Sequence, residues 1–445
     1  MSQMKIKNEK LIICLLYIFF PIAGISTFLA INYVYTLGKF TFTIYLLFVV
    51  CVLLVSRNKK FVTVPIKCSC YPLLLILLLS FGFIRTYFYD PQLVGLPSSI
   101  IFVINCLAIY YIAKIMATEY EAIPLDKIIL SSYIYFFLFN CMLFVLGVRS
   151  AATEGQYSRE METIFSFLPS RQVLPLSVGL IDSSIICLIA GVSALFLYQQ
   201  NAINTKLKLL YKAYYLAVLL MTIIMMAISG GRTAIAILFL VFIFAMIRLE
   251  NKKKTFLFVA MLAFFFPLIY LPLVFPLYTR GGLEFLEFFS RTGDVSEVIL
   301  LNNRVLIWAS TLIHLYENFN PLKLLFGYGF FGQTISGAVY EYNFIFSAAY
   351  SSNDTVNVHS SLLQILINYG ILGVIIYCAV SFKSLFYLLS DAKYKIILYI
   401  LLTSFFATMM EAQLAVDSYL LMLFLLFTSY AFVLKNKQLQ SISKI

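Results

Sequence analysis

The stretch AYYLAVLLMTIIMMAISGGRTAIAILFLVFIFAM, residues 213–246, contains a single charged residue, Arg232. An apolar run lies on each side of its short SGGR segment, and we expect spans over 209–228 and 233–249. Each run is long enough to cross about 30 Å of hydrocarbon as an α-helix. Because the hydrocarbon offers no water, each run must satisfy its own backbone hydrogen bonds, as a helix does. The stretch therefore predicts two antiparallel membrane helices joined by a tight turn.

The whole chain repeats this pattern. Of its 445 residues, 62% are hydrophobic and only 12% are charged, whereas charged residues make up about 25% of a soluble domain. We therefore expect an all-α integral membrane protein, a single polytopic domain over residues 1–445 with about twelve transmembrane helices. The expected spans are 11–32, 40–56, 71–87, 99–118, 127–147, 173–198, 209–228, 233–249, 255–278, 360–380, 396–411 and 417–434.

Lysine clusters predict the orientation of these spans. Clusters follow the second, sixth, eighth, tenth and twelfth spans, and the positive-inside rule assigns such clusters to the cytoplasm. They are Arg57, Lys59 and Lys60; Lys206 and Lys208; Lys252, Lys253 and Lys254; Lys393 and Lys395; and Lys435 and Lys437. With an even number of spans, both termini are then expected in the cytoplasm.

Two outer loops are long in this topology, 148–172 and 279–358, the second between spans nine and ten. Loops of such length without a domain of their own are usually functional. Apolar residues at helical spacing predict a helix over 303–318 in the second loop. Because Trp308 is among them, we expect this helix on the membrane surface.

The expected outer side carries arginine where the cytoplasmic side carries lysine. These arginines run against the positive-inside rule, and a guanidinium holds phosphate through two parallel hydrogen bonds. They predict a phosphate-bearing ligand at the outer face; the alternative is that they pair with acidic residues of the loops. The arginines are Arg85, Arg149, Arg159, Arg171, Arg232, Arg280, Arg291 and Arg304, and the exceptions are Lys39 and Lys323.

Three sequence motifs lie on this side. In ISGGRTA, 228–234, two glycines permit a tight turn that fixes Arg232 at the membrane boundary. NNRVLIW, 302–308, places Arg304 at the start of the loop helix, and LLFGYGFFG, 324–332, surrounds Tyr328 with glycines.

The third motif, VHSSLLQILINYGILG at 358–373, starts the tenth span. Ser361 and Gln364 have the spacing of a capping box, which places His359 just before the N-terminus of that helix. The positive end of the helix dipole disfavours a protonated imidazole, so we expect His359 to be neutral and able to accept a proton. The other histidine, His314, is expected to be an ordinary surface or interface residue.

In this order, the motifs resemble the O-antigen polymerase and O-antigen ligase superfamily of membrane glycosyltransferases over about residues 170–380. The resemblance implies a GT-C-like fold in a bacterial inner membrane and a donor glycan carried on undecaprenyl pyrophosphate. It implies no cofactor, no metal and no nucleic acid. The partners implied are the lipid-linked glycan, membrane lipid, a chain-length regulator and a flippase.

The resemblance also implies roles for named residues. Arg232 and Arg304 would stabilise the departing phosphate oxygens, and His359 would deprotonate the acceptor hydroxyl or bind phosphate. The residues expected to bind the pyrophosphate or glycan are Arg159, Arg171, Arg280, Arg291 and Tyr328.

Three functions remain open on the sequence. A polymerase of O-antigen, capsular polysaccharide or exopolysaccharide would extend another lipid-linked glycan, whereas a ligase would transfer the glycan to a lipid A core or a protein. Abundant Ile, Lys, Phe and Tyr with little His and Trp indicate an AT-rich gene, as polysaccharide clusters often are, and favour the polymerase. A lipid-linked oligosaccharide flippase could use Asp182 in its transport pathway, but no internal repeat supports it.

Overall fold

The computed structural model describes residues 2–33, 35–56, 66–120, 123–149, 172–201, 208–280, 295–301, 303–346, 356–409 and 411–442. Within these ranges the regular structure is entirely helical, and no residue lies in a strand. The expected all-α class is therefore confirmed.

The helices follow the apolar runs of the sequence. The long and apolar ones are α1 (Ser2–Tyr17), α2 (Phe19–Asn32), α3 (Tyr35–Val55), α4 (Ile66–Tyr89), α5 (Leu96–Glu119), α6 (Leu125–Val145), α8 (Leu180–Asn201), α9 (Lys208–Ile228), α10 (Arg232–Met246), α11 (Lys253–Arg280), α16 (Ser361–Leu388), α17 (Lys395–Thr408) and α18 (Tyr419–Ile442). Short helices are η1 (Leu249–Asn251), α12 (Val295–Ile299), α13 (Arg304–Glu317), α14 (Pro321–Phe326), α15 (Gly332–Ser336), η3 (Ala338–Glu341), η4 (Asn343–Phe346) and η5 (Ala392–Tyr394).

Among the described residues, nine helices are long and apolar enough to cross a membrane, or ten if the bent pair α1 and α2 forms one span. The remaining two expected spans correspond to α10 and α17, apolar helices of 15 and 14 residues. At 1.5 Å per residue these reach only about 21–23 Å, less than the hydrocarbon thickness. A multi-pass membrane protein is thus evident, whereas the count of twelve and the GT-C-like class remain predictions.

Two of the expected spans differ in detail from the helices. The first span bends by 42° between α1 and α2. The eleventh span was expected to reach residue 411, but α17 ends at Thr408, and residues 411–418 are not helical. The backbone of this segment bonds to α16 instead of continuing the helix: Ser361 Oγ donates to the carbonyl of Glu411 and accepts from Leu414 N.

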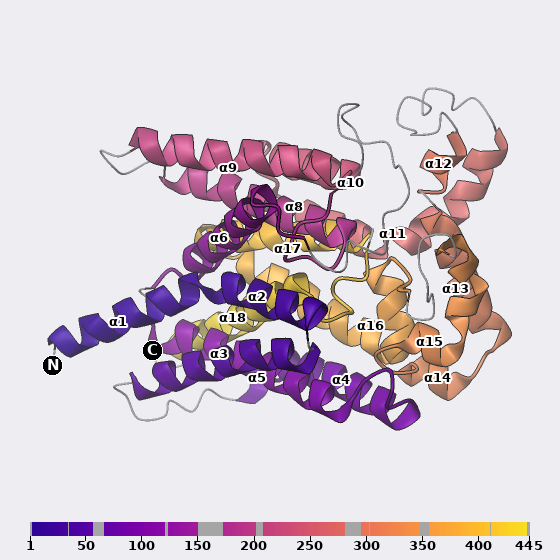
Figure 1. Ribbon diagram of the computed structural model, residues 1–445, viewed down its shortest axis with the longest axis horizontal. Helices are drawn as coiled ribbons and strands as arrows, with labels where there is room; N and C mark the ends of the chain where they lie inside the picture. The colour runs from indigo at the N-terminus through magenta and orange to yellow at the C-terminus, as the bar shows by residue number, and fades with distance from the viewer. Residues whose placement is uncertain are drawn as a thin grey trace.

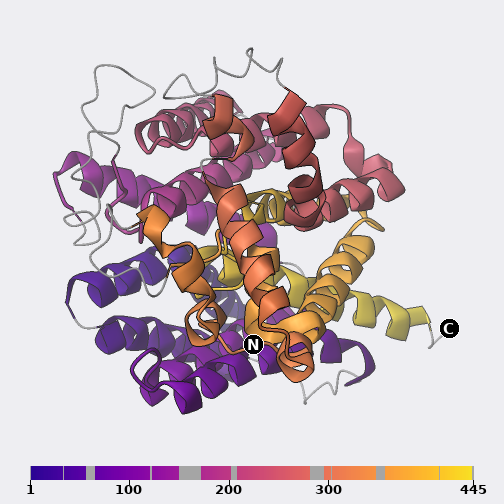
Figure 2. The same ribbon diagram turned by 90° about the vertical axis from the view of Figure 1, so that its right-hand side faces the viewer.

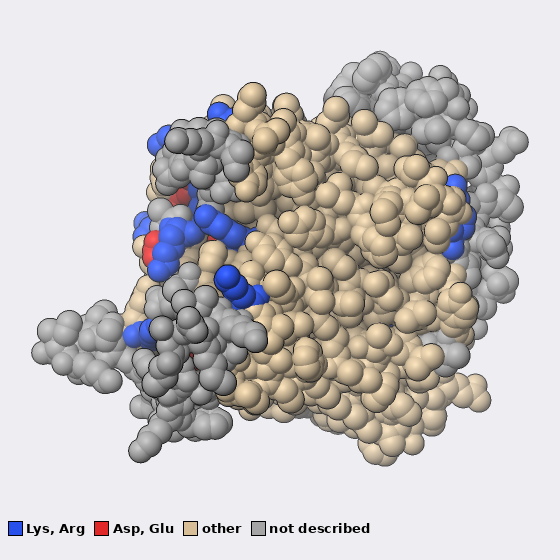
Figure 3. All heavy atoms as spheres, turned by 60° about the vertical axis from the view of Figure 1, so that its left-hand side comes forward, with Lys and Arg blue, Asp and Glu red and all other residues tan. Residues whose placement is uncertain are grey.

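Both termini lie at one end of the helix bundle, and α12 to α15 lie at the other (Figure 1). We call these the terminal end and the loop end. On the face shown in Figure 3, blue and red charged residues gather at one end and a smaller blue patch lies at the opposite edge, with a wide uncharged belt between them. Such a belt suits a hydrocarbon environment, since charged groups are costly there.

The short helices of the loop end form a cap over α11 and α16, seen face-on in Figure 2. The loop helix expected over 303–318 is confirmed as α13. Its Trp308 is fully buried among Val305, Val339, Tyr342 and Leu363. The expectation that this residue faces the membrane surface is therefore wrong: the apolar face of α13 packs inside the cap.

Candidate active site

The side chains of His359 and Glu411 are hydrogen-bonded to one another at the loop end. His359 Nδ1 lies 3.0 Å from Glu411 Oε2, and the two side chains are only 16% and 9% exposed. An ionised carboxylate can only accept a hydrogen bond, so the Nδ1 atom carries the proton. In the neutral ring the lone pair is then on Nε2. This is the arrangement of a general base whose tautomer is held by a carboxylate.

The backbone around His359 is strongly constrained. Its φ is +52°, a left-handed conformation uncommon for a residue with a side chain. Its carbonyl accepts a hydrogen bond from Trp308 Nε1 at 3.4 Å. The next residue, Ser360, is the N-cap of α16 and accepts from Leu363 N. The buried Trp308 indole and the Ser360 N-cap together hold the imidazole of His359 beside Glu411.

The helix begins where the sequence predicts, but the predicted capping box is wrong in detail. Ser360, not Ser361, caps α16. Ser361 Oγ donates to the carbonyl of Glu411 at 2.8 Å and accepts from Leu414 N. Gln364 Oε1 accepts from Val358 N at 3.0 Å. The two residues therefore tie the start of α16 to the segments on either side of it.

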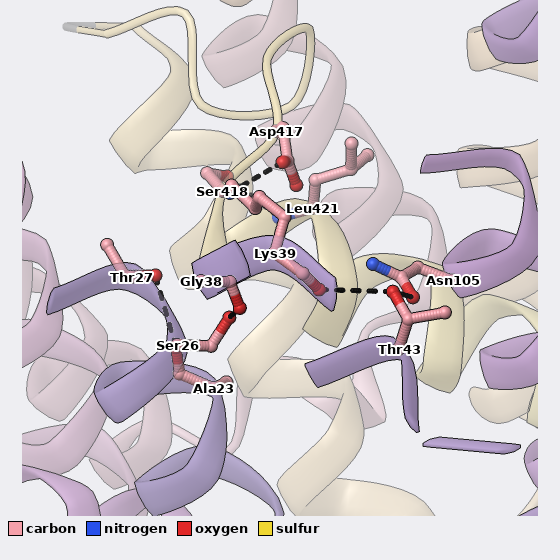
Figure 4. A network of polar contacts seen from close by, with 10 residues as sticks. All are labelled: Ala23, Ser26, Thr27, Gly38, Lys39, Thr43, Asn105, Asp417, Ser418 and Leu421. Carbon is pink, nitrogen blue, oxygen red and sulfur yellow. Dashed lines mark hydrogen bonds and ion pairs between the residues drawn. The ribbon is translucent and has the colours of Figure 1, made fainter. Parts of the chain in front are cut away.

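Glu411 was not among the residues singled out from the sequence. It belongs to the non-helical segment 411–418, which Asp417 joins to Lys39 of α3 through a 2.7 Å ion pair (Figure 4). Tyr377 Oη also donates to the carbonyl of Leu414 at 2.8 Å. The available signal was an acidic residue at the end of an apolar span, which is costly unless it has a partner.

Arg232 is the first residue of α10, as the glycine turn predicts. Gly230 has φ +72°, and a side chain at Gly231 would collide with Ser184 of α8. Ser184 Oγ also lies 2.9 Å from Ser229 Oγ. The turn therefore packs closely against α8, and the backbone of Arg232 has little conformational freedom.

The start of α8 also carries a carboxylate near Glu411, that of Asp182. Asp182 lies two residues before Ser184. Its carboxylate is repelled by Glu411 and attracted by Lys39. Its carboxylate also accepts from Val178 N at 3.0 Å, at the N-terminal end of α8 where a negative charge is favourable. Asp182 thus has a local structural role, which weakens its interpretation as part of a transport pathway.

Arg304 is the first residue of α13, and Asn303 precedes it with φ +68°. Trp308 follows one helical turn later on the same face. Because Trp308 bonds to the carbonyl of His359, that face of α13 is directed towards the His359–Glu411 pair. Of the three residues predicted to be catalytic, Arg304 begins the helix that contacts His359 through Trp308. Arg232 belongs to a separate turn, which packs against α8.

The predicted binding residues have mixed outcomes. Tyr328 lies beside α4 and α14, with its ring 5.2 Å from Lys323 Nζ. Burial raises the pKa of Tyr328, so its hydroxyl is a neutral donor near pH 7. Arg280 ends α11, and nothing is described of its side chain. Arg159, Arg171 and Arg291 lie outside the described residues, as does most of the loop 148–172.

His314 is more buried than expected of a surface residue, at 7% exposure. Its Nε2 lies 3.0 Å from the carbonyl oxygen of Ser336, and its Nδ1 lies 3.6 Å from Glu341. It fastens α13 to α15. The described part of the chain contains no group of three or more His, Cys, Asp or Glu side chains that could hold a metal.

Fold and site together define a multi-pass α-helical membrane protein with a carboxylate-held histidine and two arginine-led helix starts at one end. Residues 216–378 match the family model described as O-antigen ligase. This match supports membership of the O-antigen ligase and polymerase superfamily and confirms the resemblance seen in the motifs. The matched segment contains Arg232, Arg304 and His359 but ends before Glu411. None of the curated proteins compared matches the chain.

Proposed function

We propose that the protein polymerises oligosaccharide repeat units carried on undecaprenyl pyrophosphate, at the outer face of a bacterial cytoplasmic membrane. Its product would be an O-antigen, capsular polysaccharide or exopolysaccharide, and both termini would lie in the cytoplasm. The observation that carries the proposal is the hydrogen bond between His359 Nδ1 and Glu411, which leaves Nε2 as the basic nitrogen of a constrained imidazole.

The chemistry is the transfer of one glycosyl group. Nε2 of His359 takes the proton of the acceptor hydroxyl as its oxygen bonds to the anomeric carbon of the donor sugar. The bond from that carbon to the phosphate oxygen breaks, and its electron pair leaves with undecaprenyl pyrophosphate. Glu411 stabilises the imidazolium that forms. The proton then passes to solvent, which restores the neutral base.

Arg232 and Arg304 would stabilise the departing pyrophosphate. Each is the first residue of a helix, where the positive end of the helix dipole favours an anion. A guanidinium adds two parallel charge-assisted hydrogen bonds. Because pyrophosphate is a good leaving group, this assistance requires no metal ion and no further acid.

A ligase is the second candidate, favoured by the description of the matched family model. It would use the same base and the same arginines and differ only in its acceptor, a lipid A core sugar or a protein glycan. Deletion of the gene distinguishes the two functions. Accumulation of single repeat units on the core indicates a polymerase, whereas free polymer beside an unmodified core indicates a ligase. Unchanged glycans together with normal lipid-linked intermediates would refute both.

A further inference from the structure

A second basic cluster lies at the loop end, where α4 meets α14. Arg85 Nη1 donates to the carbonyl of Phe326 at 3.2 Å, and its guanidinium lies 5.6 Å from the centre of the Tyr89 ring. Lys323 Nζ bonds to the hydroxyl of Tyr89 and lies 4.4 Å from the centre of the same ring. It also lies 5.2 Å from the ring of Tyr328. Two cations therefore converge on one tyrosine.

The segment that carries Tyr328 is held rigidly. Gly329 has φ +114°, and a side chain there would come within 2.6 Å of Thr86 Oγ1. The N–H groups of Tyr328 and Gly329 donate to the carbonyls of Ile367 and Asn368, both at 2.9 Å. These carbonyls are free to accept because α16 breaks at Gly370, where φ is +68°. The cluster is thus built on a fixed backbone.

The charges of the cluster are not neutralised within the described chain, where neither Arg85 nor Lys323 has a carboxylate within 4.0 Å. The other outer lysine, Lys39, differs in this respect, because Asp417 pairs with it. Two adjacent like charges repel one another, and a bound anion would relieve that repulsion. Phosphate suits the pair, since an arginine fork and a lysine point charge both bind it.

An exposed apolar stripe on α4 adjoins Arg85. Phe81, Ile84 and Phe88 are 54%, 43% and 78% exposed. They share one helix face with Arg85, because residues three, four and seven apart lie above one another on a helix. Such a face can hold a hydrocarbon chain while Arg85 and Lys323 hold the phosphate at its end. The ligand chemistry indicated is therefore a lipid phosphate.

This cluster and the candidate active site lie on different helices. Arg85 and Lys323 belong to α4 and α14, which pack against α16, whereas α10, which Arg232 begins, packs against α8, α9 and α17. In Figure 1, α4 and α14 lie below α16 at the loop end, and α10 lies above it. One ligand phosphate at each position would bring two lipid-linked molecules to the same end of the bundle.

We propose that Arg85 and Lys323, with Tyr89 and Tyr328, bind the pyrophosphate of a second lipid-linked glycan, the acceptor. This inference rests on the proposed polymerase function, in which donor and acceptor both carry pyrophosphate. A ligase needs such a site only for its donor. The cluster thereby gives the acceptor of that reaction, a glycan still attached to its isoprenoid carrier, a binding site of its own.

The test counts bound lipids by native mass spectrometry of the full chain, with undecaprenyl pyrophosphate as the probe. We expect two bound molecules in wild type and one in the double variant Arg85→Gln, Lys323→Gln. Weakening of the second site should be about 100-fold or more, because a charge-assisted hydrogen bond that contributes about 10-fold or more to affinity is lost at each position. Lys323→Gln alone removes no backbone contact, so its weaker binding cannot be ascribed to misfolding.

Arg149→Gln is the matched control. Arg149 is also exposed, donates to the backbone carbonyls of Phe144 and Val148 and lies 4.9 Å from the centre of the Phe144 ring, but no second cation adjoins it in the described chain. Its variant should bind two molecules. Two bound molecules of undecaprenyl pyrophosphate on the double variant would overturn the proposal. Loss of bound phosphatidylglycerol in place of undecaprenyl pyrophosphate would also overturn it, because the cluster would then be a phospholipid site.

The proposed function is tested separately, by extension of a lipid-linked acceptor and of the same glycan on a neutral aglycone. We expect the double variant to lose its preference for the pyrophosphate acceptor while transfer to the neutral acceptor stays at the wild-type rate. If the double variant keeps that preference, the acceptor site is refuted but the proposed polymerase function is not. No extension by wild type would refute the polymerase itself, whatever the number of bound lipids.

Discussion

Glu411→Gln tests the pairing on which the proposed mechanism depends. Glutamine has nearly the same size and can still accept the Nδ1–H of His359 through its Oε1 atom. The geometry of the 3.0 Å contact is thereby retained, whereas the negative charge is removed. The hydrogen bonds that hold residues 411–418 do not involve the Glu411 side chain, because Ser361 bonds to the backbone carbonyl. The substitution therefore isolates the electrostatic contribution of Glu411.

The expected loss of turnover in Glu411→Gln follows from the positive charge that the imidazole gains in the transition state. A hydrogen bond to a charged group contributes about 1.5–3 kcal/mol. Since about 1.4 kcal/mol corresponds to a tenfold change in rate, turnover should fall about 10-fold to 150-fold. The low exposure of both side chains, 16% and 9%, means that solvent screens little of this interaction.

The assay is extension of purified lipid-linked repeat units, followed as the initial rate of polymer formation. Glu341→Gln serves as the control because Glu341 also lies near a histidine, His314, in the same part of the fold. That variant should extend chains at the wild-type rate. A wild-type rate in Glu411→Gln, or equal losses in both variants, would refute the role assigned to Glu411.

Three further predictions concern the arginines, the base and the topology. Arg232→Lys should slow extension by about 10-fold or more because lysine cannot reproduce the two parallel hydrogen bonds, and Arg304→Lys should behave alike; initial rates measure this, and wild-type rates would show that only charge matters. His359→Arg should be as inactive as His359→Ala while both still bind undecaprenyl pyrophosphate; appreciable activity of the arginine variant would make His359 a phosphate ligand. A cysteine introduced beside Lys253 should resist membrane-impermeant labelling from outside intact cells, and labelling there would reverse the predicted orientation.

Charged groups and unpaired backbone polar groups are costly in hydrocarbon, and this cost depends on a few consecutive residues. Membrane spans can therefore be recognised in the sequence. The uncharged runs on either side of Arg232 predict α9 and α10, and the two glycines between them predict the turn. The predicted helix over 303–318 is present as α13. Each of these features depends on residues that are close together in the chain.

Contacts between distant segments could not be recognised in this way. Glu411 follows His359 by 52 positions, and nothing in the spacing of the intervening apolar residues indicates that they meet. Trp308 has the amphipathic setting of a membrane-surface residue, yet it is buried because the cap supplies an apolar surface for it. Serine at 360 or 361 could equally cap a helix, and the choice depends on which hydroxyl Leu414 and Glu411 engage.

Composition, hydropathy and short motifs are thus sufficient for the all-helical membrane class, most span positions and three residues of the candidate site. The pairing of His359 with Glu411, the anchoring of residues 411–418 by Lys39 and the convergence of Arg85 with Lys323 depend on how the helices pack. The physical reason is the range of the interactions. Membrane partitioning and helix formation act over a few consecutive residues, whereas an ion pair requires only proximity in space, which the folded chain alone provides.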